Sequence, residues 1–139
     1  MPLYFAYGRL MNRDTMAGRC PRSKPLGVAQ LDGYRLIITR EGVPSIVKAP
    51  MKCVHGVLWD VAIGEVPLID SAEALLRGGM DKVFIPVRYK GQPRSSLVYV
   101  SRTAVSGKAH DRAVAGMMDA VKDWNQPKLY QDEVAKLLD

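Results

Sequence analysis

Glu73 is a carboxylate whose sequence neighbours could suit it to proton transfer. It lies in the segment Leu-Ile-Asp-Ser-Ala-Glu-Ala at residues 68–74, where most neighbours are apolar or small. A carboxylate sheltered among apolar groups has a raised pKa, and it could then act as a general base and afterwards as a general acid. The residues alone favour a plainer interpretation, because Glu73 precedes Arg77 by four residues, the spacing of an ion pair on an exposed helix.

The segment Tyr-Gly-Arg-Leu-Met-Asn at residues 7–12 is a second candidate for chemistry. It follows a predicted strand and leads through Gly8 into a predicted helix. Such a turn could present several backbone N–H groups to an anion or to a developing oxyanion. Spacing alone favours an ordinary strand-to-helix turn, so both interpretations stay open at this stage.

The remaining cysteine and histidine residues predict neither a metal centre nor a cofactor site. Cys20 and Cys53 form no C-x-x-C pair, and His55 and His110 are the two histidines of the chain. These are too few for a histidine-based metal site, and no glycine-rich nucleotide-binding motif is present. A Cys-His pair is conceivable, but we expect Cys53 to be a buried strand residue and His55 to face the core beside Trp59.

The elements that must position these residues are short strands with helices near both ends of the chain. Apolar and aromatic alternation predicts strands at residues 2–7, 26–31, 34–39, 45–47, 53–61, 83–89 and 96–101. Asp32-Gly33 between two of them is typical of a hairpin turn. Helices are expected over 13–19, 63–77, 108–124 and 129–138, with Asn12 capping the first and Asp70 capping a turn of the second.

These elements predict an α+β fold: a small mixed, mostly antiparallel β-barrel with flanking helices, formed by a single domain over residues 1–139. Several short strands with few helices between them do not fit a strict alternation of strand and helix. Closure into a barrel would also remove exposed strand edges.

Composition narrows the possible functions. Hydrophobic residues make up 47% of the 139 residues, and no apolar stretch reaches the length of a membrane span. The N-terminus lacks the pattern of a signal peptide, so we expect a cytoplasmic protein. The net charge of +6 suggests nucleic acid as a partner, but the 20 Lys and Arg residues are scattered and never adjacent, which argues against nucleic-acid binding.

Five motifs, in order along nearly the whole chain, resemble the gamma-glutamylcyclotransferase-like family. The family opens with a strand and Y-G-S-N, and this chain has Tyr-Gly-Arg-Leu at residues 7–10 after an aromatic strand, with Cys-Pro at 20–21. The next three motifs are Leu-Asp-Gly-Tyr-Arg-Leu at 31–36, Val-His-Gly-Val-Leu-Trp at 54–59 and Ile-Asp-Ser-Ala-Glu-Ala at 69–74. The last is Trp-Asn-Gln-Pro-Lys-Leu-Tyr at 124–130.

The resemblance implies a small mixed barrel and a reaction. Family enzymes cyclise a gamma-glutamyl group to 5-oxoproline and release an amine or amino acid, without metal or nucleotide. It implies that Glu73 is the general base and acid. It also implies that Tyr7, Gly8, Arg9 and Leu10 bind the small-molecule gamma-glutamyl substrate through the backbone of their turn.

The chain departs from the family pattern at the same site. Arg9 and Leu10 replace the family's Ser and Asn, Ala74 replaces a glycine, and Met80 stands where the family has an aromatic residue. Backbone donors survive such changes, whereas side-chain donors do not. The alternative is therefore a non-catalytic small-molecule-binding protein of the same fold, with a pocket altered by Arg9 and Leu10.

Overall fold

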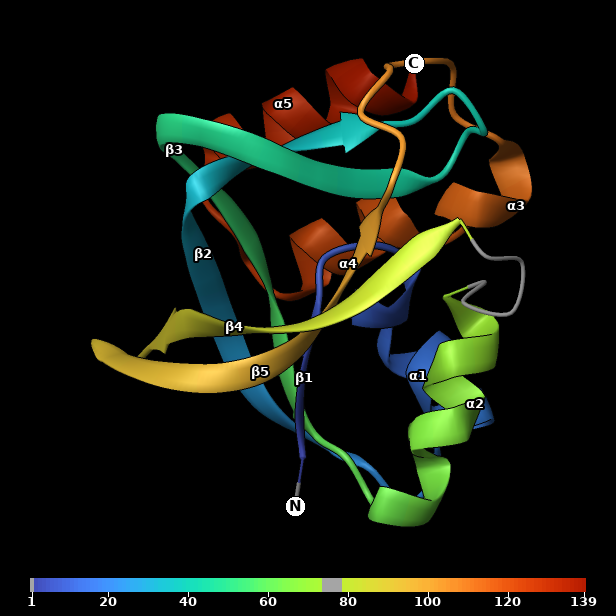
Figure 1. Cartoon of the computed structure of the whole chain (residues 1–139), viewed down its shortest axis with the longest axis vertical. Helices are drawn as coiled ribbons and strands as arrows, with labels where there is room; N and C mark the ends of the chain where they lie inside the picture. Colours follow the sequence, from blue (N-terminus) through green and yellow to red (C-terminus); the bar gives the residue numbers. More distant parts are fainter. Residues whose placement is uncertain (1, 74–78) are drawn as a thin grey trace.

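The chain forms a closed five-stranded barrel (Figure 1). The computed structural model describes residues 2–73 and 79–139. The strands are β1 (Leu3–Ala6), β2 (Lys24–Ile38), β3 (Pro44–Asp60), β4 (Met80–Tyr89) and β5 (Gln92–Ser101), in the order β1-β3-β2-β4-β5. All neighbours are antiparallel except β1 and β5, which close the barrel in parallel. The predicted fold, a mixed and mostly antiparallel barrel with flanking helices, is confirmed.

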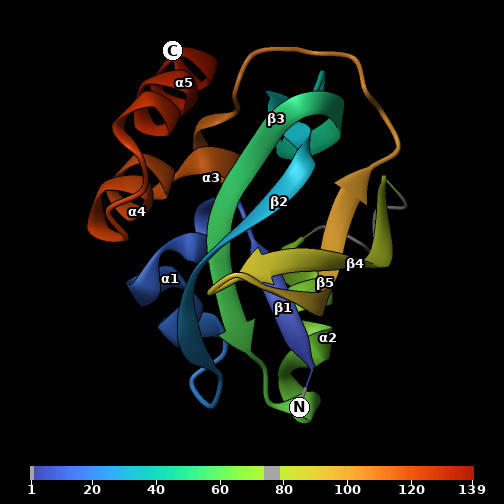
Figure 2. The ribbon, with the colours of Figure 1, turned by 90° about the vertical axis from the view of Figure 1, so that its left-hand side faces the viewer.

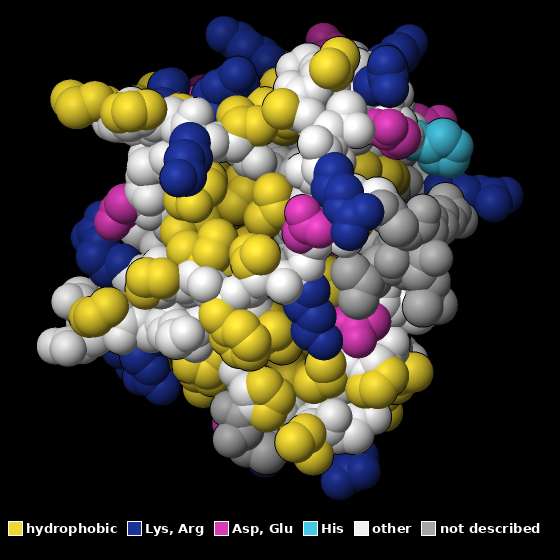
Figure 3. All heavy atoms as spheres, viewed as in Figure 1, with side chains coloured by type: hydrophobic (Ala, Val, Ile, Leu, Met, Phe, Trp, Pro, Cys, Tyr) yellow, Lys and Arg dark blue, Asp and Glu magenta, His cyan; other side chains and the backbone are white. Residues whose placement is uncertain are grey.

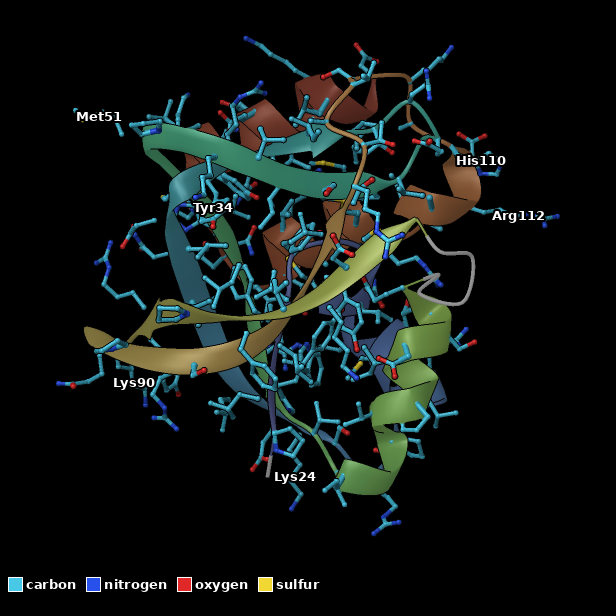
Figure 4. The ribbon with its side chains drawn as sticks, in the orientation of Figure 1. Lys24, Tyr34, Met51, Lys90, His110 and Arg112 are labelled. Carbon is cyan, nitrogen blue, oxygen red and sulfur yellow. The ribbon has the colours of Figure 1, made fainter. Side chains whose placement is uncertain are left out.

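The predicted hairpin at Asp32-Gly33 is wrong, because β2 runs straight through it. Gly33 does have the left-handed backbone that the dipeptide suggests, with φ of +82°. That conformation is used for a bulge: Asp32 pairs with Cys53, whereas Tyr34 pairs with Lys48, so residues 49–52 protrude from β3. Met51 marks the resulting corner at the outer edge of the molecule (Figure 4). The chain turns instead at residues 39–43, where Thr39 N–H donates to the Val43 carbonyl at 2.9 Å.

The N-terminal helices follow the sequence prediction in part. The first strand leads into η1 (Arg9–Met11) and then α1 (Arg13–Arg19), where the Asn12 side chain accepts from Thr15 N–H as an N-cap, as predicted. After β3 come η2 (Ile63–Glu65) and α2 (Val66–Ala72). Asp70 lies inside α2 rather than at its N-cap, because the helix already begins at Val66. The predicted continuation over residues 74–77, and its end at Gly78, lie outside the described residues.

The predicted long helix at residues 108–124 is broken in two. The structure has α3 (Asp111–Val114) and α4 (Met117–Asp123), followed by α5 (Lys128–Leu138). Gly116 separates them with φ of +76°, and its carbonyl accepts a hydrogen bond from Asn12 Nδ2 at 3.1 Å. A contact with a residue far earlier in the chain therefore interrupts an otherwise helical apolar pattern.

The strand β1 runs through the core, and its residues Tyr4, Phe5 and Ala6 are almost fully buried. Helices α3, α4 and α5 gather on one side of the barrel, whereas α2 lies away from them (Figure 2). Gly56 of β3 lies so close to β1 that a Cβ there would sit 2.4 Å from the Ala6 carbonyl oxygen. This close approach fixes the position of β1, which contains Tyr4 and leads into the turn at residues 7–10.

The surface shows no single dominant basic area on the face drawn in Figure 3. Lys and Arg side chains are dispersed there among apolar and acidic ones (Figure 3). No helix within residues 2–73 and 79–139 is both long enough and apolar enough to cross a membrane.

Candidate active site

The Glu73 carboxylate lies against the first strand of the barrel. Glu73 is the C-cap of α2, where its N–H donates to the Ile69 carbonyl at 2.8 Å. Its side chain is half-buried. Oε1 accepts a 2.7 Å hydrogen bond from the hydroxyl of Tyr4, a buried residue of β1. The structure therefore brings the end of α2 to the strand that leads into the turn at residues 7–10.

Opposing effects act on the protonation of Glu73. Burial is the largest effect and raises the pKa of the carboxyl above its usual value. The Tyr4 hydrogen bond and the positive charge of Arg9 favour the ionised form and partly offset that rise. The net result is a carboxyl whose pKa is shifted upward, in the direction expected of a group that exchanges protons near neutral pH.

A network of tyrosines holds α2 to the barrel beside Glu73. The Tyr99 hydroxyl of β5 donates to Asp70 of α2, and Asp70 also pairs with Lys82 at 3.0 Å. The Tyr99 and Tyr4 rings meet edge to face, with centroids 5.7 Å apart. Burial raises the pKa of both phenols, so their hydroxyls stay protonated and act as donors.

Tyr7 joins this network from the end of the first strand. Its hydroxyl donates to the Tyr99 backbone carbonyl, and burial raises the pKa of this phenol as well. Tyr7 and Leu10 are both buried in the core. Their side chains therefore position the turn, and what they can offer a ligand is backbone.

The turn at residues 8–10 has free backbone donors. Met11 N–H donates to the Gly8 carbonyl and Asn12 N–H to the Arg9 carbonyl, each at 3.1 Å. No hydrogen bond among residues 2–73 and 79–139 uses the N–H groups of Gly8, Arg9 or Leu10. Three successive unpaired donors could serve a carboxylate or an oxyanion.

Two neighbours of Glu73 were not identified from the sequence as site residues. Tyr4 was interpreted only as part of an aromatic strand, and Tyr99 only as part of a later strand. Their contacts with Glu73 and Asp70 depend on closure of the barrel, for which the local sequence carries no signal. The alternative pairing of Glu73 with Arg77 involves a residue outside the described part of the chain.

The Cys-His pair lies elsewhere, beneath α5. Cys53 Sγ is 3.4 Å from His55 Nε2, and both side chains are half-buried. Cys53 lies in β3 as expected, but the expectation that it is buried is wrong. Burial raises the pKa of the Cys53 thiol and lowers that of His55, so both are favoured in their neutral forms. His55 packs edge to face on Tyr130, with centroids 4.7 Å apart, whereas Trp59 packs on Trp124. His55 therefore packs on Tyr130, a residue of the core, and Trp59 packs on a different aromatic residue. Within residues 2–73 and 79–139, no group of three or more acidic, cysteine or histidine side chains is arranged to hold a metal ion.

Comparison with known protein families identifies the family of this chain. The family model described as gamma-glutamyl cyclotransferase, AIG2-like, matches residues 4–126. The chain therefore belongs to this family.

Solved structures share the fold at low identity. A structure named gamma-glutamyl cyclotransferase superposes with a TM-score of 0.88 at 20% identity, covering 99% of this chain and 88% of that one. The uncharacterized protein loc79017 from Homo sapiens gives 0.87 at 21%, covering 99% and 87%. YkqA from Bacillus subtilis gives 0.81 at 18%, and this chain covers 53% of its length. The sequence has no significant match among curated proteins.

Proposed function

We propose that the protein cyclises a gamma-glutamyl amide to 5-oxoproline and releases an amine or amino acid, with Glu73 as general base and then general acid. Membership of the gamma-glutamyl cyclotransferase family supports the reaction type. The observation that carries the assignment of Glu73 is its half-buried carboxylate, hydrogen-bonded to Tyr4 on the strand that leads into the free N–H groups of residues 8–10.

The reaction needs only a proton carrier and a site that holds the substrate folded. The substrate's α-amino nitrogen attacks its own γ-carbonyl carbon, and a new C–N bond closes a five-membered ring. Because nucleophile and electrophile belong to one molecule, correct orientation supplies much of the rate enhancement. The bond from the γ-carbon to the departing nitrogen then breaks, and no water is consumed.

Glu73 would balance the protons of these two steps. It accepts a proton from the attacking amine and returns a proton to the departing nitrogen, so the amine leaves as a neutral molecule. Tyr4 occupies Oε1 and the other oxygen, Oε2, has no hydrogen-bond partner among the described residues. Oε2 is therefore the atom that we assign to proton transfer.

The turn would stabilise the negative charge that develops during ring closure. In the tetrahedral intermediate the γ-carbonyl oxygen becomes an oxyanion, and backbone N–H donors fixed in advance stabilise such a charge without reorganisation. The unpaired N–H groups of Gly8, Arg9 and Leu10 are the donors that we assign to this role. These groups depend on the backbone, so the departure from the Y-G-S-N pattern leaves them intact.

Product analysis tests the proposal. Purified protein is incubated with gamma-glutamyl amino acids and gamma-glutamyl alkylamines, and both 5-oxoproline and free glutamate are quantified. Ring closure predicts 5-oxoproline in amounts equal to the released amine. Free glutamate in its place would indicate hydrolysis and would contradict the proposal.

The alternative function is binding without turnover, and the observation that favours it is Arg9. The positive charge of Arg9 lowers the pKa of the Glu73 carboxyl and so favours its ionised form. An ionised carboxylate beside an arginine also suits a purely structural role, in which Glu73 would transfer no proton. Binding of gamma-glutamyl compounds with no 5-oxoproline formed by any of them would favour this alternative over the enzyme.

A further inference from the structure

A hollow opens between η1, α1 and α2, next to the candidate active site. Its walls are formed by Arg9, Thr15, Gly18, Arg19 and Leu68, and its volume is about 380 Å³. Both α1 and α2 lie toward the same end of the barrel, where the chain begins (Figures 1 and 2). The hollow is shallow and widely open to solvent, and its area of contact suits an amino-acid side chain with its carboxylate.

Two arginines, Arg9 and Arg19, make this hollow positively charged. The guanidinium groups of Arg9 and Arg19 form no ion pair or hydrogen bond with a residue among 2–73 and 79–139. The Thr15 hydroxyl is bonded to Asn12 Oδ1 at 3.2 Å, and Leu68 supplies a partly exposed apolar wall. Guanidinium groups match the planar geometry of a carboxylate, so this is a place for an acidic group with a short apolar stem.

Arg9 connects the hollow to Glu73. It lines the hollow, and its charge acts on the Glu73 carboxylate. A substrate whose departing nitrogen lies at Glu73 would therefore extend its leaving group past Arg9 toward Arg19. The glutamyl half, in contrast, belongs at the N–H groups of the turn.

We propose that the hollow formed by Arg9 and Arg19 binds the leaving group, and that the enzyme prefers gamma-glutamyl compounds whose departing amine carries carboxylates. This inference rests on the proposed function and narrows its substrate class. A departing dicarboxylic amino acid offers one carboxylate to each guanidinium, a neutral amino acid offers one, and an alkylamine offers none. Arg9 and Arg19 are specificity-determining residues in this account.

The test compares three substrates that share the glutamyl half. They are gamma-glutamyl-glutamate, gamma-glutamyl-glutamine and gamma-glutamyl-propylamine, and the readout is kcat/KM for amine release. The expected order follows the number of carboxylates, with an advantage of about tenfold for each carboxylate, the scale of one charge-assisted hydrogen bond. Equal kcat/KM values for all three would overturn the proposal.

Variants assign the preference to the hollow. Arg19→Gln is expected to lower kcat/KM for gamma-glutamyl-glutamate several-fold more than for gamma-glutamyl-propylamine, and Arg19→Lys should restore part of the difference. Arg112→Gln is the matched control, because it removes the same charge from an exposed side chain that projects from the edge of the molecule (Figure 4) and does not line the hollow. A preference that survives Arg19→Gln unchanged would overturn the proposal.

A binding measurement separates this inference from the proposed function. Calorimetry of Glu73→Gln with gamma-glutamyl-glutamate and gamma-glutamyl-propylamine measures the preference without turnover. If the wild-type protein makes no 5-oxoproline, the proposed function fails. Tighter, Arg19-dependent and salt-sensitive binding of the acidic compound would still support the subsite, whereas equal binding would overturn it.

Discussion

The Tyr4 hydroxyl donates a 2.7 Å hydrogen bond to Oε1 of Glu73, although 69 residues separate the two. Tyr4 is fully enclosed in the barrel, and Glu73 ends the helix that packs outside it. The bond therefore fixes the carboxylate relative to the turn at residues 8–10 and also stabilises its ionised form. Tyr4 of the first strand therefore contributes both to the position of the Glu73 carboxyl and, against the larger effect of burial, to its protonation.

Substitution Tyr4→Phe should shift the pH profile of the enzyme. The hydrogen bond lowers the pKa of the Glu73 carboxyl, so its loss raises that pKa further. The base is ionised only above its pKa, and the acid limb of kcat/KM should therefore move to higher pH. Rates measured across the acid limb test this shift. Tyr34→Phe, at a half-buried tyrosine with no side-chain hydrogen bond among the described residues, should leave the limb in place.

Glu73→Gln should change how stability depends on pH. The pKa of the carboxyl is raised in the folded protein, so folding favours its protonated form. The contribution of Glu73 to stability is therefore fully present below its ordinary pKa and is lost as pH rises through the raised value. Gln does not titrate, and the Tm of Glu73→Gln relative to wild type should increase as the pH is raised from about 4, the ordinary pKa of a glutamate, through the raised pKa. A difference in Tm that is constant or falls over this range would contradict the raised pKa.

Much of the barrel can be predicted from local sequence. The strand-forming segments and the Asn12 cap depend on neighbouring residues, and both are found in the structure, although the seven predicted strands merge into five. The errors arise where contacts between residues far apart in the sequence determine the local structure. The left-handed Gly33 serves a bulge rather than a turn because β3 continues alongside it, and Gly116 breaks a helical pattern because Asn12 bonds to it.

Part of the candidate site could also be predicted from the sequence. Glu73 and the turn at residues 7–10 were identified through motifs that resemble a family, since their own spacing favoured ordinary structural roles. Tyr4 and Tyr99 gave no local signal, because only the parallel closure of β1 on β5 brings their rings together. Their contribution to the site follows from topology.

Gly18→Ala should stabilise the protein by about 0.5–1 kcal/mol, the usual cost of glycine inside a helix. Gly18 lies within α1 without a positive φ, and an added Cβ would meet nothing within 4 Å. Urea unfolding measures the change through the midpoint. A lower midpoint than that of the wild type would contradict this view of α1.

Gly56→Ala should have the opposite effect. Its Cβ would lie 2.4 Å from the Ala6 carbonyl oxygen and 2.7 Å from the Phe5 ring, so β1 and β3 must separate. Overpacking of this kind costs about 1–3 kcal/mol, and the same urea experiment measures it. The displacement of β1 should also lower the rate of 5-oxoproline formation. Unchanged stability would mean that the two strands are not in such close contact.

The role of Glu73 is tested most directly by the rate of 5-oxoproline formation in Glu73→Gln. Gln keeps the size of the side chain and an oxygen for Tyr4 but cannot exchange a proton. We expect kcat to fall by about 10²–10⁴, the usual contribution of a general acid–base. Glu41→Gln, the same change at an exposed glutamate of the turn between β2 and β3, should retain wild-type kcat. A Glu73→Gln protein that forms 5-oxoproline as fast as the wild type would contradict the account.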